Sequence, residues 1–327
     1  MTATLEPLEL ASTDVYLGPA ERRFFGGGYR RSTRELTDLT LVTDATGVGR
    51  LTATARVTYP TDWSRKGLND QSPHLSTVDV IALGQEATSL YLSGALGLSP
   101  ADPGVQLVGA VKVSAGTSAV EDELDAFPVV VSARSAPLVG TSTIETAFNC
   151  SIGTLKLSLT MRHPEVAARD LVVVAATSAK LDSCRDVRDA HRHPFATDWA
   201  ERRNTATDIH IDRQSHTATA QSAPSPIVAG TRAADLIVDS FVMTLQLGQI
   251  LLYEMDSIDR AHSNTLWMRQ TSFSWSEDTS YVLGKSTYHL DRARVLDRGD
   301  HRWRVADIVG DVYGVTTRCS VAHRLPC

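Results

Sequence analysis

The sequence predicts an α+β protein in which an antiparallel sheet wraps around a long central helix, and it predicts this unit twice. Two long apolar segments carry the prediction, because residues 77–97 and the first half of residues 237–269 have the pattern of helices buried on most sides. Each contains a Val-Asp pair near its start, and the two aspartates, Asp79 and Asp239, lie 160 positions apart. Strand-like sequence precedes and follows both. This order of elements is typical of a double hotdog fold built by internal duplication.

The flanking segments alternate apolar residues with Thr, Ser and Lys, which is typical of antiparallel strands. They lack the strand-helix alternation of a parallel α/β enzyme. Before the two helices, the expected strands are residues 38–42, 50–59, 208–212 and 216–220. After the helices, they are residues 106–114, 128–133, 142–151, 155–162, 171–178, 266–275, 280–290, 302–309 and 312–322.

A charged, proline-containing segment is the expected boundary between the halves. We therefore expect a first hotdog unit with an N-terminal arm at residues 1–185, a linker at 186–205 and a second hotdog unit at 206–327. Single hotdog units usually pair to complete the fold, and the duplication supplies this pair within one chain. The expected state is a monomer, with a homodimer equally allowed.

Composition limits the class of partner. The chain has 327 residues, of which 42% are hydrophobic, and a net charge of −6 without a dense basic run, so nothing favours nucleic acid. The N-terminus lacks a charged-then-apolar signal pattern, and no apolar stretch reaches the roughly 18 residues expected of a membrane span. A cytoplasmic protein without membrane contact is expected.

The cysteines and histidines do not form a metal-binding pattern. Four widely spaced cysteines lack a CxxC pair, and free, mostly buried thiols are expected at Cys150, Cys184, Cys319 and Cys327. The pair His191 and His193 lies in a charged segment without an accompanying carboxylate or thiolate set. No metal and no other cofactor is expected.

Polar side chains interrupt the apolar helices. In the second helix these are Asp239, Gln246 and Gln249, and Asp239 and Gln246 share a face because they are seven residues apart. In the first helix, Glu86 stands seven residues after Asp79. Two interpretations of Asp239 are open: a cap on the first turn, or a group in a pocket.

His74 lies just before the first helix, where Ser76 or Thr77 is a credible N-cap. A neutral histidine near a helix N-terminus is a common general base, and a histidine here is equally common as a hydrogen-bonding loop residue. In a double hotdog, reactive groups lie where one helix N-terminus meets the other unit. We expect His74 and Asp79 to meet Asp239 and Gln246 in one pocket.

Three consecutive glycines at residues 26–28 lie between Phe24-Phe25 and Tyr29, and they allow close approach of the backbone. They are not a phosphate loop, because no Gly-Lys-Ser/Thr follows. The four arginines nearby could contact an anionic substrate, and a purely structural bulge or edge is the alternative. These arginines are Arg22, Arg23, Arg30 and Arg31.

Several long segments resemble the AvrD family, the avirulence D proteins of plant-associated bacteria with relatives in actinomycetes. They are YLGPAERRFFGGGYRR, VTYPTDWSRKGLNDQSPHLSTVDVIAL and LGQILLYEMDSIDRAHSNTLWMR. The resemblance implies a biosynthetic enzyme of secondary metabolism that makes syringolides, in which a 3-oxoacyl chain is joined to the ketose xylulose. The implied reaction is similar to that of the gamma-butyrolactone synthases, which transfer a 3-oxoacyl group to a small hydroxyketone. The implied partners are an acyl carrier protein or coenzyme A thioester and a small sugar-like acceptor.

The favoured hypothesis is therefore an acyltransferase or condensing enzyme. His74 would act as general base on the acceptor hydroxyl, Asp239 would orient His74 or the acceptor, and Gln246 would hold a hydroxyl or carbonyl. Gln249, Glu86 and Tyr29 are further candidates for substrate binding. Arg269 would meet a phosphate or form a salt bridge on a strand face, and Trp267 would bind substrate or pack in the core.

Two other hypotheses stay open. Dehydratases of polyketide and fatty-acid synthesis are double hotdogs that pair a histidine before one helix with an aspartate at the start of the other, as His74 and Asp239 are placed. However, the glycine expected four residues after that histidine is absent, and Met243 stands where Gln or His would follow the aspartate. The third hypothesis is a non-catalytic module that binds an acyl ligand, with Asp79 and Asp239 as ordinary caps.

Overall fold

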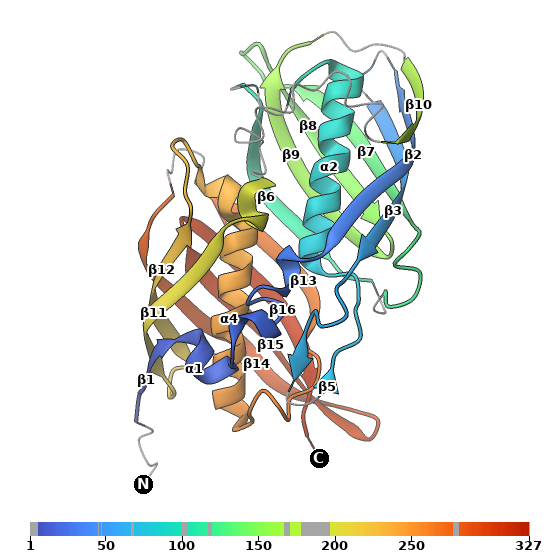
Figure 1. Cartoon of the computed structure of the whole chain (residues 1–327). Helices are drawn as coiled ribbons and strands as arrows, with labels where there is room; N and C mark the ends of the chain where they lie inside the picture. Colours follow the sequence, from blue (N-terminus) through green and yellow to red (C-terminus); the bar gives the residue numbers. More distant parts are fainter. Residues whose placement is uncertain are drawn as a thin grey trace. The chain divides into compact units, whose positions relative to one another are not determined.

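The computed structural model describes residues 6–44, 46, 48–66, 69–99, 102, 104–116, 120–166, 171–177, 197–276 and 281–326. The chain forms two compact units, named here by their central helices (Figure 1). The α2 unit comprises Ser32–Tyr59 and Pro73–Asp198. The α4 unit comprises Met1–Arg31, Pro60–Ser72 and Trp199–Cys327.

In the α2 unit, the helix α2 (Thr77–Leu96) packs on an antiparallel sheet. In spatial order the described strands are β6 (Gln106–Ser114), β9 (Leu155–Pro164), β8 (Thr143–Ile152), β7 (Phe127–Pro137), β3 (Val48–Thr58), β2 (Thr33–Thr43) and β10 (Leu171–Thr177). Alternate residues of β3, β7 and β9 are buried, which matches the expected pattern of one face toward a core.

The α4 unit has the same arrangement around α4 (Ile237–Asp256). Its described strands, in spatial order, are β13 (Trp267–Trp275), β16 (Val315–Arg324), β15 (His301–Val312), β14 (Gly284–Arg298), β12 (Thr217–Ser225), β11 (Arg203–Asp212) and β1 (Leu8–Ser12). Its short elements are α1 (Thr13–Leu17), η1 (Ala20–Arg22), η2 (Gly28–Arg30), β4 (Arg65–Lys66), β5 (Asn69–Asp70) and η6 (Ala233–Leu236). A further short turn, η5 (Thr197–Ala200), precedes β11.

The matching strand orders confirm the predicted double hotdog and its internal duplication. The sequence β6-β9-β8-β7-β3-β2 in one unit corresponds to β13-β16-β15-β14-β12-β11 in the other. The 160-residue spacing of Asp79 and Asp239 recurs in the corresponding strands β9 and β16, where it relates His163 to His323. Only the outermost described strand differs, since it is β10 in one unit and β1 in the other.

The bounds of the units differ from the contiguous ranges expected from the sequence, because the N-terminal arm belongs to the α4 unit. Its strand β1 pairs with β11, with Leu8 opposite Ile211 (Figure 1). Leu10 and Leu17 join the apolar cluster beneath α4, so burial of apolar surface favours this placement. Of the predicted linker at 186–205, residues 186–196 lie outside the described part, and β11 already begins at Arg203.

Helix α4 is buried on nearly all sides, as predicted, with only Gln249 and its last three residues outside the buried set. Gly248 allows it to lie close to β15, because a Cβ there would come within 2.2 Å of the Ile308 side chain. The segment Ala233–Asp256 is long and apolar enough to span a membrane, contrary to the expectation from the sequence. However, 94% of its most apolar window is buried inside the protein, as in the core helix of a soluble protein.

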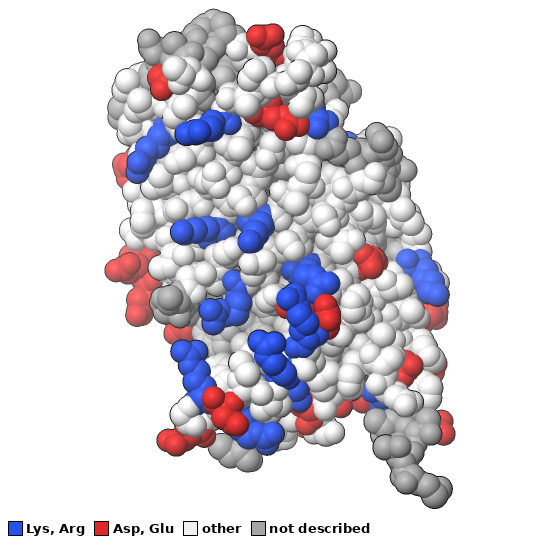
Figure 2. Space-filling model, turned by 180° about the vertical axis from the view of Figure 1, so that it is seen from behind, with Lys and Arg blue, Asp and Glu red and all other residues white. Residues whose placement is uncertain are grey.

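The described cysteines match the prediction, since Cys150 and Cys319 are free and buried. Burial raises the pKa of each thiol to about 12. Cys184, Cys327, His191 and His193 lie outside the described residues. On the face shown in Figure 2, Lys and Arg side chains form a loose group with Asp and Glu among them, so the surface charge there is mixed.

Candidate functional site

The N-terminus of α2 holds a buried carboxylate. Asp79 is fully buried and forms a capping box with Ser76, whose Oγ accepts from the Asp79 backbone N–H. Arg34 on β2 donates to Asp79 Oδ1 from Nε at 2.8 Å and from Nη2 at 2.6 Å. Tyr59 donates its hydroxyl to Asp79 Oδ2 and lies 2.8 Å from the His74 carbonyl oxygen. Burial, and then the Asp79 charge, raise the pKa of Tyr59.

The N-terminus of α4 holds a carboxylate at the equivalent position, with different partners. Asp239 is fully buried, and Arg202 donates to its Oδ2 from Nε at 3.0 Å and from Nη2 at 2.7 Å. The Asn204 side chain donates to Oδ1 at 2.8 Å. The N-cap residue, Leu236, has no side-chain cap hydrogen bond. Asp239 is therefore held by an ion pair with the strand in front of it, and the capping interpretation applies to Asp79 instead.

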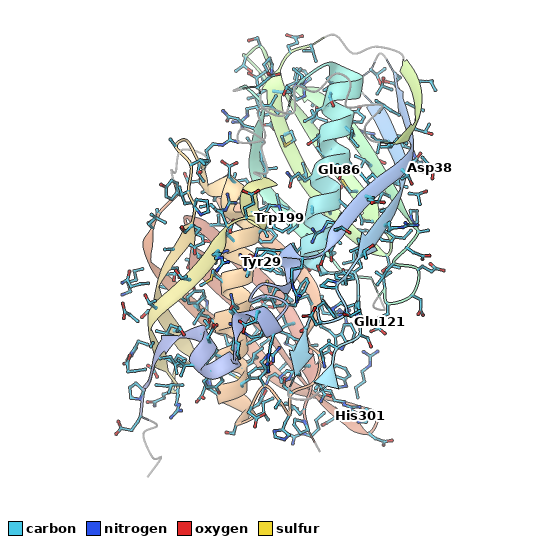
Figure 3. All side chains as sticks on the ribbon, viewed as in Figure 1. Tyr29, Asp38, Glu86, Glu121, Trp199 and His301 are labelled. Carbon is cyan, nitrogen blue, oxygen red and sulfur yellow. The ribbon has the colours of Figure 1, made fainter. Side chains whose placement is uncertain are left out.

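Tyr29 lies beside this second carboxylate. It is 1% exposed, stacks on Trp199 at a centroid distance of 5.9 Å, and lies under the Arg30 guanidinium. Burial, and then the charge of Asp239, raise the pKa of Tyr29 to about 12. Figure 3 shows Tyr29 and Trp199 next to each other in the α4 unit. The structure thus brings together two of the predicted site residues, Tyr29 and Asp239.

The four residues expected in one pocket are divided between the units. His74 and Asp79 belong to the α2 unit, and Asp239 and Gln246 belong to the α4 unit. His74 is half-buried and precedes α2, as predicted from the sequence. Their convergence on one pocket stays a prediction.

Gln246 is buried and contacts the N-terminal arm. Its Oε1 accepts from Arg23 Nη1 at 2.7 Å and from the Thr13 hydroxyl at 3.5 Å. Gln249 is partly exposed on α4, and Glu86 is partly exposed on α2, where it is labelled in Figure 3. Of the predicted substrate-binding groups in the helices, only Gln246 is fixed by the arm.

Trp267 and Arg269 lie at the start of β13. Trp267 is half-buried, and Arg269 is exposed at the β-bulge where the pairing with β16 shifts between Met268 and Gln270. Among the described residues Arg269 has no ion pair, so the salt bridge expected as one alternative is not formed there, and its contact with a phosphate stays a prediction.

The partners of the two carboxylates were not identified from the sequence. Arg34 lies on β2 and Arg202 just before β11, in front of the related segments LTDL and ATDI. The aspartate of each segment, Asp38 or Asp208, has a positive φ and lies at a bulge. The signal that could have revealed the arginines is this second repeat, because a charge beside an apolar strand requires a partner when buried.

One cavity of about 310 Å³ lies in the α4 unit between the arm and the loop that follows α4. Three arginines, one carboxylate and the turn after α1 form most of its lining. The lining residues are Tyr16, Leu17, Gly18, Pro19, Arg22, Arg23, Asp259, Arg260 and Ala261.

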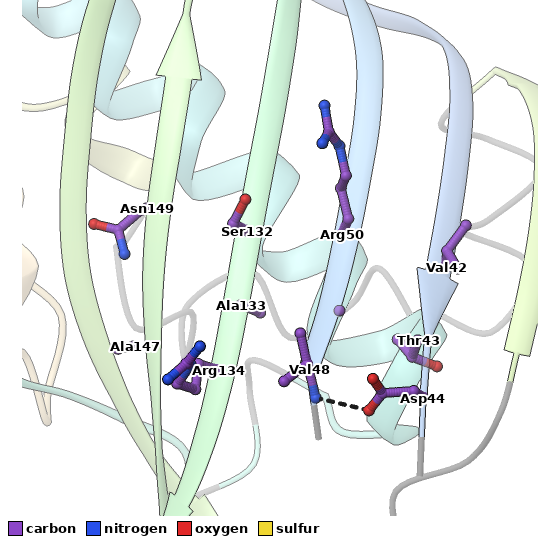
Figure 4. A pocket seen from close by; sticks show the side chains of 11 residues that line it. Val42, Thr43, Asp44, Val48, Arg50, Ser132, Ala133, Arg134, Ala147 and Asn149 are labelled. Carbon is purple, nitrogen blue, oxygen red and sulfur yellow. Dashed lines mark hydrogen bonds between the residues drawn. The ribbon is translucent and has the colours of Figure 1, made fainter. Parts of the chain in front are cut away.

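A second, more open hollow of about 720 Å³ lies in the α2 unit, over strands β2, β3, β7 and β8 (Figure 4). Arg50, Ser132 and Asn149 point to its exposed side. The carboxylate at its rim, Asp44, accepts backbone N–H bonds from Thr46 at 2.8 Å and Val48 at 3.2 Å, so it fixes the β2–β3 turn.

The other end of α4 carries a buried ionic cluster. Asp256 accepts from Arg304 Nε at 2.9 Å and lies 3.1 Å from His323 Nε2. Burial by itself would raise the pKa of Asp256, but the hydrogen bonds from His323 and Arg304 outweigh it, and the pKa is lowered. Because the helix dipole disfavours a negative charge at a C-terminus, these partners are what stabilise the carboxylate there.

We expect Asp256→Asn to lower the free energy of unfolding at pH 7 by about 1–3 kcal/mol, because a charge-assisted hydrogen-bond network is broken. The folded-state pKa of Asp256 is depressed, so its contribution is present above the unfolded pKa and is lost as pH falls through the folded value. Urea unfolding at pH 7 and pH 3 tests this. A difference between wild type and variant that stays constant with pH would contradict it.

The fold and these buried sites define a class: the chain is a double hotdog protein. Solved structures that are similar to this chain include the tesB protein of Mycobacterium avium subs paratuberculosis (TM-score 0.40, 10% identity, 85% of this chain and 93% of that chain covered). Another is the dehydratase domain from the CurJ module of curacin polyketide synthase (TM-score 0.35, 12% identity, 88% and 96% covered). No curated protein sequence matches the chain.

A match between the sequence and a protein-family model identifies the family within this class. The model of the Pseudomonas avirulence D protein (AvrD) family matches residues 9–326, and the chain belongs to this family. The match spans both units and includes the arm from β1 onward, which confirms the resemblance found in the sequence.

Proposed function

We propose that the protein is a biosynthetic acyltransferase that joins a 3-oxoacyl thioester to a small, sugar-like hydroxyketone of the xylulose type. Membership of the AvrD family supports a biosynthetic role. A thioester of coenzyme A or of an acyl carrier protein would supply the acyl group.

The observation that carries the proposal is the position of His74. The residue lies directly before the N-terminus of α2, and its backbone carbonyl accepts a hydrogen bond from Tyr59, which also binds Asp79. By contrast, the buried histidines His163 and His323 lie within strands, bonded to Thr146 and Asp256. The first turn of a helix presents backbone N–H groups and a positive dipole end, which suit a developing oxyanion.

The proposed reaction is an acyl transfer to oxygen. His74 takes the proton of the acceptor hydroxyl while that oxygen forms a bond to the thioester carbonyl carbon. The tetrahedral oxyanion collapses, the C–S bond breaks, and the leaving thiolate takes the proton from the imidazolium. The products are an acyl ester and a free thiol. Asp79 acts as a positioning residue, because it holds Tyr59 against the His74 segment.

Mass spectrometry after mixing the protein with a 3-oxoacyl thioester and xylulose tests the proposal. We expect an acyl-sugar mass, reduced at least about 100-fold in His74→Ala, because general-base catalysis contributes about 10²–10⁴-fold. The matched control is His301→Ala, which removes an exposed histidine at the β14–β15 turn and is expected to keep full activity.

Three results would contradict parts of the proposal. Product from His74→Ala at the wild-type rate would exclude His74 as the base. Loss of water from a 3-hydroxyacyl thioester, without need of an acceptor, would indicate a dehydratase. A tightly retained acyl ligand with neither reaction would indicate a binding module.

A further inference from the structure

The arginine-lined cavity of the α4 unit carries more positive charge than its surroundings neutralise. Arg22, Arg23 and Arg260 line it, and the only carboxylate in its lining is Asp259. Both oxygens of Asp259 lie 2.8 Å from His262 Nδ1 on the exposed side of the loop. The one carboxylate in the lining is thus already engaged by a neighbour.

Arg23 is held rigidly, with its side chain only 4% exposed. Nη2 donates to Asp14, and Nη1 donates to Gln246 Oε1 at 2.7 Å. The third nitrogen of the guanidinium, Nε, is buried and has no hydrogen-bond partner among the described residues. A buried guanidinium donor without an acceptor is costly, so the hydrogen bonds within the α4 unit leave Arg23 only partly satisfied beside the cavity.

Arg260 and its neighbour Lys66, which lie close enough to repel each other, have no carboxylate partner in the described part of the chain. Lys66 donates to Ser263 Oγ at 3.2 Å and to the Asn264 carbonyl at 2.5 Å, both neutral groups. Burial, and then the charge of Arg260, lower the pKa of Lys66 to about 8. Burial also lowers the pKa of Arg260, and only the neighbouring Tyr253 opposes it. Uncompensated, partly buried positive charge of this kind is typical of an anion-binding site.

We propose that this cavity binds the phosphate group of a substrate. Guanidinium groups bind phosphate through paired, charge-assisted hydrogen bonds, and several cations around one small cavity match its two negative charges. The phosphate belongs to a phosphorylated ketose acceptor or to the coenzyme A or carrier thioester. This inference rests on the proposed acyl transfer for the identity of the ligand, but not for the existence of the site.

The same arrangement gives Gln246 a function. An amide in a helix that is otherwise apolar needs a partner, and its partner is the arginine that lines the cavity. The three glycines after Arg23 reinforce this, because the backbone N–H groups of residues 26, 27 and 28 all donate to the Arg23 carbonyl at 3.1 Å. Gln246 and the glycines are thus positioning residues for Arg23.

Titration calorimetry without turnover tests the site. We expect inorganic phosphate to bind the wild-type protein, and Arg260→Met and Lys66→Met each to weaken binding by about tenfold or more. Arg298→Met is the matched control, since Arg298 is an exposed arginine on β14 of the same unit and lies outside the cavity, and its phosphate affinity should equal that of wild type. Far-ultraviolet circular dichroism of each variant establishes that it is folded.

Two pairs of ligands distinguish the sources of the phosphate. Tighter binding of xylulose 5-phosphate than of xylulose assigns the cavity to the acceptor, and tighter binding of coenzyme A than of its 3′-dephospho form assigns it to the carrier. Equal affinity of wild type and both cavity variants for every phosphate ligand would overturn the inference. Because binding is measured without acyl transfer, phosphate binding with no transferase activity would refute the proposed function and leave the site intact.

Discussion

Replacing Arg202 by methionine is expected to lower the free energy of unfolding by about 3–5 kcal/mol, because Asp239 is then left as a buried charge without its ion-pair partner. Both side chains are fully buried, and the arginine also donates to the Asp235 carbonyl at 3.0 Å. Methionine keeps much of the volume but none of the charge. Urea unfolding followed by circular dichroism measures the effect.

The neighbouring residue provides the control. Arg203 is exposed and opens β11, so Arg203→Met should change the free energy of unfolding by less than about 0.5 kcal/mol. Adding Asp239→Asn to Arg202→Met should recover part of the loss, because no charge is then buried unpaired. If the Arg202→Met protein were as stable as wild type, the Asp239 carboxylate would not need its ion pair with Arg202, and this prediction would be refuted.

Alanine at Gly26 or Gly28 is expected to destabilise the arm by about 1–3 kcal/mol through overpacking. A Cβ at Gly26 would come within 2.3 Å of the Ala20 carbonyl oxygen, and one at Gly28 within 2.3 Å of the Trp63 carbonyl oxygen. Both obstacles are backbone atoms, so a side-chain rotation cannot relieve them. Because these glycines fix Arg23, phosphate binding should weaken together with stability.

Gly27 is the internal control for this prediction. A Cβ there would meet the end of the Arg30 side chain at 3.1 Å, and that side chain can move. Gly27→Ala should therefore leave both the melting temperature and phosphate binding near those of wild type. Equal melting temperatures for all three alanine variants would contradict the close backbone approach.

The two units have kept one architecture and acquired different polar groups. In the α2 unit, the buried aspartate caps its helix and binds Tyr59, which fixes the segment of His74. In the α4 unit, the equivalent aspartate binds Asn204 of β11 and Arg202 just before that strand, and Arg23 of the arm binds Gln246. The equivalent aspartates of the two units therefore have different partners, although the strand order around them is the same.

The sequence by itself determined the repeated unit, the two central helices and most strands. These features depend on local periodicity, since the alternation in β3 and the all-round apolar pattern of α4 follow from which faces are buried. It also placed His74 before a helix and identified Asp79, Asp239, Gln246 and Tyr29 as unusual residues. The local sequence also limited the N-cap of α2 to Ser76 or Thr77, and the structure shows that it is Ser76.

Only the tertiary structure decided the partners of these residues. Arg202 with Asp239 and Arg23 with Gln246 are pairs separated by 37 and 223 positions. The placement of β1 against β11 is equally remote in sequence. The local periodicity of a sequence predicts that a polar side chain is buried. It does not predict which residue, distant in sequence, forms the ion pair or hydrogen bond with that side chain. That choice depends on how the arm, the loop after α4 and the strand in front of it fold onto one helix, where burial makes each pairing necessary.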